Sequence, residues 1–326
     1  MTRRYEKISR QLNIDAGEIL KPLQELSDCT CCPRDCHVDR INGEHGFCHS
    51  GAGLCVVSIC AHRGEEPVIS GKHGICNIFF AGCNMQCAFC QNYEISRAEC
   101  QTSESGTELV EIIRQVETIL ATGSKGVGFV SPSHALPQMK VIMAALKARG
   151  YDQTYVFNTN AYDNTEAIIS LLDVIDVWLP DLKYMDERLG RLYSDAPNYP
   201  QIATAAIKEM YARTGAEIRL DDDDTIESGL IIRHLVLPGE VENSRTVLRW
   251  IAEELSPSVH ISLMSQYHPT PLVAGHSRLD RTLRAEEYEE VVEEFERLGF
   301  YRGWVQELDS PAHYRPDFNR RHPFED

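Results

Sequence analysis

The sequence predicts an α/β protein built on a partial (β/α)6 barrel of the TIM type, with a Cys-rich metal-binding extension in front of it. Three observations lead there. From residue 76 onward, short apolar runs alternate with amphipathic helical segments, which is typical of a parallel sheet. All 12 cysteines fall within the first 100 of 326 residues, and residues 29–75 show no sustained period, so this segment needs a metal or a larger neighbour to fold on. The alternation of strands and helices by itself is compatible with a full barrel, a partial barrel or an open doubly wound sheet, and the motifs described below favour the barrel.

Short apolar runs predict six strands, at Cys76–Ala81, Gly126–Val130, Thr154–Thr159, Val177–Leu182, Leu230–Leu237 and His260–Tyr267. Helices lie between them, because apolar residues recur at helical spacing in segments that begin near Leu109, Val247 and Tyr288. For the second of these helices we expect Ser244 to be the N-cap. The run Asp221–Asp224, between turn-forming glycines, predicts a surface hairpin or loop before the fifth strand.

These patterns divide the chain into a Cys-rich module at residues 1–70, a barrel at 71–275, and a helix with an extended tail at 276–326. The formal net charge of −17 argues against nucleic acid and anionic membranes as partners, since no local basic patch offsets it. No apolar stretch approaches the ~20 residues of a membrane span, and the N-terminal residues lack the apolar region of a secretory signal. We therefore expect a cytoplasmic protein, in which clustered cysteines indicate metal or redox chemistry.

The pattern C-x3-C-x2-C is the strongest signal in the chain. Cys83, Cys87 and Cys90 follow directly on a predicted strand, on one tight loop. Three thiolates there can hold three corners of a cubane iron–sulfur cluster and leave the fourth iron open for a reacting ligand. The alternative is a zinc loop with a fourth ligand from Cys76 or Cys100.

This loop, with an aromatic residue before its last Cys, resembles the signature of the radical S-adenosylmethionine (radical SAM) superfamily. The resemblance implies a [4Fe–4S] cluster on Cys83, Cys87 and Cys90, with SAM on the open iron. It also implies reductive cleavage of SAM to a 5′-deoxyadenosyl radical that abstracts hydrogen, an electron donor of the flavodoxin or ferredoxin type, and Phe89 packed near the adenine.

Further segments are similar to homologues of pyruvate formate-lyase activating enzyme, and they occur in order along the barrel: Phe79–Cys83, Cys90–Ser96, Asn158–Tyr162, Leu179–Tyr184, Arg233–Gly239 and Leu263–Pro269. Most of them sit at strand ends, which form the mouth of a (β/α) barrel where sites are built. We therefore expect Asn158, Lys183, Arg233 and His268 to converge on SAM.

The chain departs from the activating enzymes in places. Ser131 and Ser133 stand where that family carries a Gly-Gly-Glu-Pro stretch that binds the SAM amino group, and we expect their hydroxyls and carbonyls to serve instead. Gln91 replaces a His that often follows the last cluster Cys. These changes weaken the prediction that the substrate is the glycine of a glycyl radical enzyme, but not the prediction of SAM cleavage.

A second set of cysteines, Cys29, Cys32, Cys36 and Cys48, precedes the barrel. Four thiols with a distant fourth member fit tetrahedral zinc or a second iron–sulfur cluster, and spacing does not decide between them. The alternative is a group of reduced, packed thiols, the reading we give to Cys31, Cys55, Cys60, Cys76 and Cys100. The nearby His62, Arg63, Glu65 and Glu66 join the module to the barrel and are candidates to line the substrate side.

Three functions remain open from the sequence. The first is a radical SAM enzyme that abstracts hydrogen from a protein or peptide backbone, with glycyl radical enzyme activation as one form. The second is radical modification of a side chain or a small molecule. The third is a non-enzymatic iron–sulfur or zinc scaffold, which would neither bind nor cleave SAM.

Overall fold

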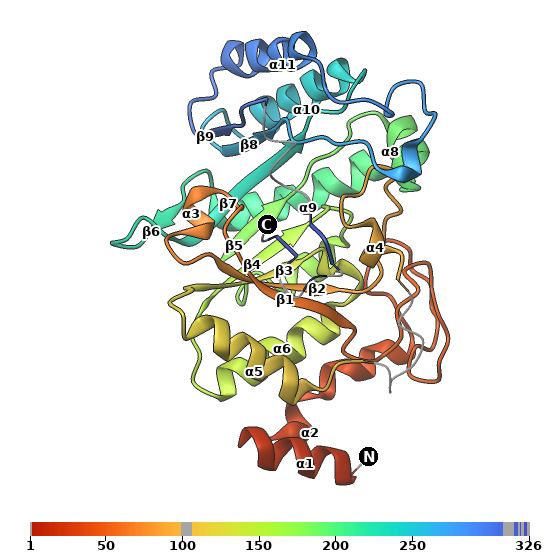
Figure 1. Cartoon of the computed structure of the whole chain (residues 1–326), viewed down its shortest axis with the longest axis vertical. Coiled ribbons are helices and arrows are strands. Elements are labelled where there is room, and N and C mark those ends of the chain that lie inside the picture. Colours follow the sequence, from red (N-terminus) through yellow and green to blue (C-terminus); the bar gives the residue numbers. More distant parts are fainter. Residues whose placement is uncertain (1, 99–105, 309–315, 319, 321–322, 325–326) are drawn as a thin grey trace.

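The computed structural model describes residues 2–98, 106–308, 316–318, 320 and 323–324, and Figure 1 shows the course of the chain. One sheet runs through the molecule in the order β1-β2-β3-β4-β5-β7-β8-β9, and β6 pairs with β7 at its side. The strands are β1 Val56–His62, β2 Ile75–Phe80, β3 Gly126–Val130, β4 Thr154–Thr159, β5 Val177–Pro180, β6 Arg219–Leu220, β7 Ile226–Leu235, β8 His260–Met264 and β9 Gly303–Val305.

Helices connect successive strands and cover the outside of the sheet, as Figure 1 shows for α5 and α6 on one side and α10 and α11 at the far end. The helices are α1 Thr2–Leu12, α2 Ala16–Ile19, α3 Pro67–Ser70, α4 Tyr93–Ser96, α5 Leu109–Leu120, α6 Leu136–Ala148, α7 Thr165–Ile169, α8 Glu187–Ser194, α9 Tyr199–Thr214, α10 Val241–Glu254 and α11 Ala285–Arg297. Short 3₁₀ turns lie at Lys21–Ser27, Pro132–His134 and Pro271–Val273.

The predicted α/β architecture with a partial barrel is confirmed. All six predicted strands form, and β2, β3, β4, β5, β7 and β8 run parallel to their neighbours in that order. Two strands were not predicted. β1 pairs antiparallel with β2, and β9 extends the parallel sheet beyond β8. The sheet thus runs past both ends of the predicted 71–275 barrel, and the three-part division of the chain stays a prediction.

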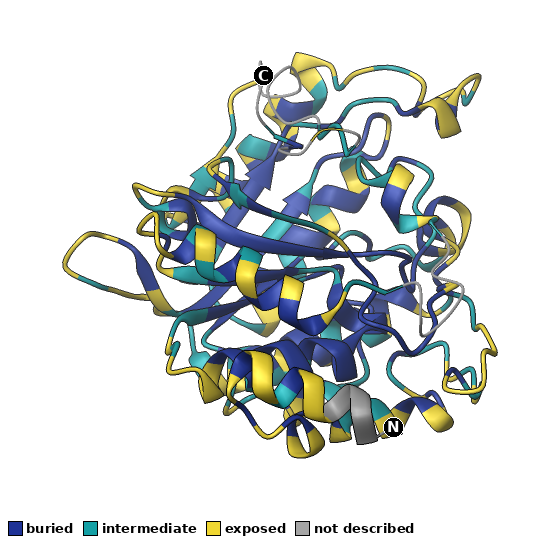
Figure 2. Ribbon diagram, turned by 60° about the horizontal axis from the view of Figure 1, so that its bottom comes forward, coloured by how far each residue is buried: buried dark blue, intermediate teal, exposed yellow. Residues whose placement is uncertain are grey.

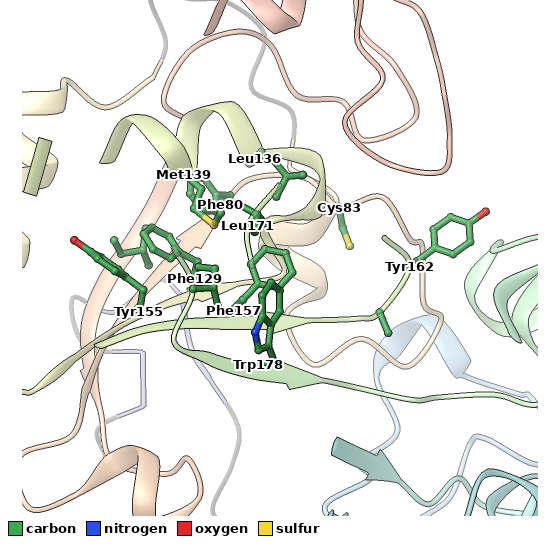
Figure 3. Packing of buried hydrophobic residues seen from close by; sticks show 14 of the residues in the cluster. Phe80, Cys83, Phe129, Leu136, Met139, Tyr155, Phe157, Tyr162, Leu171 and Trp178 are labelled. Atoms are coloured by element: carbon green, nitrogen blue, oxygen red, sulfur yellow. The ribbon is translucent and has the colours of Figure 1, made fainter. Parts of the chain in front are cut away.

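The apolar core lies between the sheet and its helices (Figure 2). On α5, Ile112, Ile113 and Val116 are fully buried, and burial of each such side chain stabilises the fold by about 1.5–3 kcal/mol. Figure 3 shows that the aromatic rings of Phe129 and Phe157 pack inside the cluster, with Cys83 near its edge. Cys83, the first cysteine of the C-x3-C-x2-C pattern, therefore lies beside the packed core.

The structure corrects the predicted start of α10. The helix begins at Val241, after a turn in which Gly239 has φ +76°, so Ser244 lies one turn inside and is not the N-cap. Its hydroxyl instead lies 2.8 Å from Nε2 of the buried His234. The Asp221–Asp224 run forms the predicted hairpin, between β6 and β7, and Lys125 pairs with Asp221 there at 2.6 Å.

None of the helices in the described residues combines the length and the apolar character that crossing a bilayer requires.

Candidate active site

The loop after β2 brings the three cysteines of the C-x3-C-x2-C pattern to one cavity. Cys83, Cys87 and Cys90 all line a cavity of about 580 Å³ inside the partial barrel. The loop opens at Gly82, whose φ is +82°, a backbone conformation that glycine adopts without strain. A Cβ at Gly82 would overlap the backbone oxygen of Cys48, so the N-terminal module packs directly on the start of this loop.

Each of the three sulfurs accepts a hydrogen bond. Ser194 donates to Cys87 Sγ at 3.0 Å, Ser96 donates to Cys90 Sγ at 3.5 Å, and Cys83 Sγ accepts from the Met85 backbone N–H at 3.4 Å. The Asn160 amide also reaches Cys83 Sγ, at 3.6 Å. Hydrogen bonds to sulfur stabilise ligating thiolates and tune the potential of a cluster bound to them.

Burial keeps the thiols of Cys83 and Cys87 protonated until a metal takes the place of the proton. Burial raises the pKa of Cys87 to about 11, although the ammonium of Lys183 nearby acts in the opposite direction. Burial likewise raises the pKa of Cys83 far above its ordinary range, and the neighbouring Cys87 adds to the effect. A thiol must lose its proton to bind metal, so metal binding here would release protons.

Polar side chains from the carboxyl ends of β3, β4 and β5 form the wall beside the thiols. Ser131, Asn158 and Lys183 all line the cavity. Lys183 is paired with Asp181 at 2.6 Å, and although burial alone would lower the pKa of the ammonium, Asp181 outweighs burial and raises it. The wall therefore offers a charged ammonium, a carboxylate, an amide and a hydroxyl within one cavity.

At another part of the same cavity, Arg233 of β7 is paired with two carboxylates. Its Nε donates to Glu66 at 2.8 Å, and its Nη2 contacts both Glu65 and Glu66. Asn77 donates to the other oxygen of Glu65 at 2.7 Å. Burial opposes ionisation of Glu65, but Arg233 outweighs it and lowers the pKa of that carboxyl to about 2.

The second set of cysteines also meets at one place. Cys29, Cys31, Cys32, Cys36 and Cys48 line a small cavity together with the buried side chains of Arg40 and His134. Positive φ angles at Asp35 and His37 turn the chain so that thiols from both sides of the loop face inward. Cys60 and Cys76 are buried elsewhere. Cys55 is disulfide-bonded, which corrects the prediction that it is a reduced thiol, and Cys100 lies outside the described residues.

One arginine connects the two cysteine sites. Arg34, between Cys32 and Cys36, donates from Nε to the backbone oxygen of Asn84 at 2.9 Å and from Nη2 to that of Asp195. Its guanidinium lies 3.4 Å from the centre of the Phe47 ring. Arg34 thus joins the N-terminal module to the loop that carries Cys83.

Comparison with known families matches residues 77–251, more than half of the chain, to the family described as the radical SAM superfamily. The chain belongs to this superfamily. The uncharacterized protein MJ0674 of Methanocaldococcus jannaschii is 29% identical over 276 residues, which cover 82% of this chain and 74% of that protein.

Solved structures give more distant similarities. A domain of a pyruvate-formate lyase-activating enzyme from Bacteroides vulgatus is 15% identical with a TM-score of 0.38, over 53% of this chain and 93% of that one. SuiB of Streptococcus suis bound to S-adenosylmethionine is 11% identical with a TM-score of 0.49, over 74% of this chain and 52% of that one.

As a radical SAM protein the chain is an enzyme, and it uses a [4Fe–4S] cluster and SAM. Family membership therefore rules against the non-enzymatic scaffold. The donor set fits the cluster, because three thiols with hydrogen-bonded sulfurs face one cavity. Within the described ranges, no three His, Cys, Asp or Glu side chains are grouped as ligands of a single ion. A cluster differs from such a site in that each thiolate binds a different iron, so its thiols stand further apart.

The structure brings most of the predicted SAM-binding residues to the cavity, since Phe89, Ser131, Asn158, Lys183 and Arg233 line it. Ser133 and His268 are not among its lining residues.

Both exceptions have a local cause. Ser133 is fully buried in a 3₁₀ turn, with its hydroxyl 3.3 Å from that of Thr159. His268 was expected at the end of a strand, but β8 ends at Met264, four residues before it.

Sequence reasoning gave no role to Asn160 and Asp181, which lie inside motifs that it quoted. Both line the cavity, where Asn160 contacts Cys83 and Asp181 holds Lys183. A signal existed, because each lies within two residues of a predicted SAM ligand at a strand end. The pairing of Arg233 with Glu65 and Glu66 had no such signal.

Proposed function

We propose that Cys83, Cys87 and Cys90 hold the [4Fe–4S] cluster and leave its fourth iron open for SAM. The observation that carries this assignment is that the three sulfurs, each with its own hydrogen-bond donor, open on one cavity of about 580 Å³. When bound, the reduced cluster supplies one electron that cleaves SAM to methionine and a hydrogen-abstracting 5′-deoxyadenosyl radical.

The chain's own residues bind and orient SAM in this proposal. Lys183, fixed by Asp181, pairs with the SAM carboxylate or a ribose hydroxyl, and the amide of Asn158 holds the ribose or the amino group. Ser131 offers a hydroxyl and a carbonyl to the amino group, and Phe89 packs near the adenine. Arg233 lies in the same cavity, but its Nε and Nη2 are engaged by two carboxylates, so we give it the role of holding these in place.

For the substrate we propose a protein or peptide, with activation of a glycyl radical enzyme as the form that the resemblance to activating enzymes predicts. An electron donor of the flavodoxin or ferredoxin type completes the proposal. Radical modification of a peptide side chain or a small molecule is the alternative. An assay of the reaction products with a purified protein substrate distinguishes these two functions.

We further propose that Cys29, Cys32, Cys36 and Cys48 bind a second metal, either zinc or an iron–sulfur cluster. The proposal is supported by four thiols that line one cavity although Cys48 is 12 residues from Cys36 in the sequence. Metal binding and local folding are coupled at such sites, so binding would draw the thiols closer than they stand without metal.

The test is anaerobic reconstitution with iron and sulfide, followed by reduction with dithionite in the presence of SAM. We expect 5′-deoxyadenosine from the wild type, with about four irons per chain plus zinc, or about eight irons if the second site holds a cluster. Cys87→Ala should lose 5′-deoxyadenosine and retain the second metal. Cys76→Ala removes a buried thiol outside the cavity and should behave as the wild type. If Cys87→Ala still cleaves SAM, the ligand assignment is wrong.

A further inference from the structure

The two ends of the cavity differ in chemistry because β1 runs opposite to its neighbours. His62, the last residue of β1, pairs with Ile75, the first residue of β2, whereas the cluster loop follows the last residue of β2, Phe80. The loop after β1 therefore enters the barrel from the end away from the thiols. The loop nevertheless reaches far into the cavity, because its partner Arg233 forms a β-bridge with Asp181, the residue that pairs with Lys183.

That loop carries Glu65 and Glu66, which line the same cavity as the thiols. Glu66 forms a bidentate salt bridge with Arg233, whose Nε and Nη2 lie 2.8 Å and 2.5 Å from the two carboxylate oxygens. The charges of Glu66 and Arg233 therefore cancel. Glu65 shares Nη2 and receives an amide hydrogen bond from Asn77 at 2.7 Å. Two carboxylates thus face one guanidinium, so Glu65, Glu66 and Arg233 together carry one surplus negative charge. This charge is buried, because only 9% of the Glu65 side chain is exposed.

A neighbouring histidine is incompletely satisfied. His62 lines the same cavity and is 8% exposed, and within the described part of the chain its buried Nδ1 has no hydrogen-bond partner. Burial lowers the pKa of His62, so the ring is neutral near pH 7 and cannot balance the surplus charge of Glu65. A buried surplus charge and an orphaned ring nitrogen each destabilise a protein, and a ligand that donates to both removes the two penalties together.

We propose that this end of the cavity, formed by His62, Glu65, Glu66 and Arg233, binds a cationic nitrogen of the substrate, an ammonium or a guanidinium such as a lysine or arginine side chain supplies. The inference rests on the proposed function, because it takes the substrate to extend from the cationic end toward the SAM held at the thiols. Glu65 is the counter-ion, Arg233 fixes both carboxylates, and His62 accepts a hydrogen bond from the cation.

The test uses two matched probes, N-acetyl-lysine N-methylamide and N-acetyl-norleucine N-methylamide, which differ in the terminal ammonium. Each is titrated calorimetrically into the reconstituted enzyme with SAM and without reductant, so that no turnover occurs. We expect the lysine probe to bind at least 10-fold more tightly. Equal binding of the two probes to the wild type overturns the proposal and requires no variant.

Two variants locate the effect. Glu65→Gln should weaken the lysine probe about 10-fold and leave SAM affinity within 2-fold. Glu287→Gln removes a carboxylate that is equally well paired, with Arg281, outside the cavity, and should leave the probe unaffected. If Glu65→Gln weakens SAM and not the lysine probe, the cation at this end is that of SAM, and the proposal is wrong. Probe binding is read without SAM cleavage, so failure of the proposed radical chemistry is seen separately, as absent 5′-deoxyadenosine.

Discussion

The hydrogen bonds to the cluster thiols differ in length, and at the scale of single residues this difference is measurable. Ser194 lies 3.0 Å from Cys87 Sγ, whereas Ser96 lies 3.5 Å from Cys90 Sγ. A donor to a ligating sulfur stabilises the reduced, more negative cluster, so losing the donor lowers the midpoint potential. For one hydrogen bond of about 1 kcal/mol the shift is about 40 mV for one electron.

We therefore predict that Ser194→Ala lowers the midpoint potential of the reconstituted cluster by about 40 mV, and that Ser96→Ala lowers it less. Redox titration followed by electron paramagnetic resonance measures both. Equal shifts, or none for Ser194→Ala, would contradict the geometry of the cluster loop.

A second prediction at this scale concerns Asp163. Burial raises its pKa to about 6, even though Thr159 donates a hydrogen bond to Oδ2. Between its ordinary value near 4 and about 6, the folded state binds a proton that the unfolded state has lost, so the stability falls as the pH rises through this window. Above it the ionised, buried carboxylate opposes folding by about 2–3 kcal/mol.

Asp163→Asn removes this opposition. We expect the variant to melt above the wild type at pH 7.5, with a gap that narrows when both are measured at pH 5 by circular dichroism. A gap that is the same at both pH values would indicate that Asp163 does not titrate in this range.

Residue-scale prediction from the sequence succeeded where the chemistry is local. The spacing of Cys83, Cys87 and Cys90 placed three thiols on one loop, and all three reach the cavity. No sequence pattern indicated that Arg233 pairs with Glu66, because Glu66 lies 167 residues away in a loop without a periodic pattern. A contact between segments so distant is set by the way the barrel closes, which the sequence of neither segment encodes.

At the scale of elements, the contact between Gly82 and the Cys48 carbonyl places the cluster loop against the N-terminal module. Gly150 provides a control, because its φ of +87° is similar but no atom lies within 4 Å of the position its Cβ would take. We predict that Gly150→Ala lowers the stability by about 1 kcal/mol through backbone strain alone. Gly82→Ala should have a larger effect and should lose iron from the cluster loop.

Chemical denaturation gives the two stabilities, and iron analysis after reconstitution gives the cluster. Similar losses of stability in the two variants, with full iron in both, would show that the module does not constrain the loop.

The sequence predicted some strands accurately and missed others. Strands β3 and β4 were predicted to the residue, because parallel strands that are buried on both faces are near-continuous apolar runs. β1 escaped prediction because its exposed positions alternate irregularly and its neighbours are rich in Cys and Gly. β1 therefore lies within residues 1–70, the segment that we predicted as the cysteine module.

At the scale of the whole molecule, Arg34 joins the segment that carries one set of cysteines to the loop that carries the other. It stacks on Phe47 and donates to Asn84 and Asp195, three partners that a lysine cannot serve together. We predict that Arg34→Ala and Arg34→Lys both reduce the iron retained by Cys83, Cys87 and Cys90, although neither change removes a ligand.

Arg188→Ala is the control, since this exposed arginine lies on α8 and its side chain forms a surface ion pair with Asp186. Iron content and the resonance spectrum of the reduced cluster, with and without SAM, are the measurements. If Arg34→Lys retains a wild-type spectrum, a positive charge at this place is sufficient and the planar geometry is not needed.

The antiparallel pairing of β1 with β2 has a practical consequence for anyone who shortens the chain. β1 occupies the hydrogen-bonding groups on the outer side of β2 from Ile75 to Phe80. A fragment that begins at residue 71 lacks β1, so the backbone hydrogen-bonding groups on this side of β2 would be unpaired. β2 is apolar and is buried along its whole length in the full chain. Such bare edges pair with other chains, so we expect this fragment to aggregate on size-exclusion chromatography, whereas a fragment that begins at residue 53 keeps the edge covered.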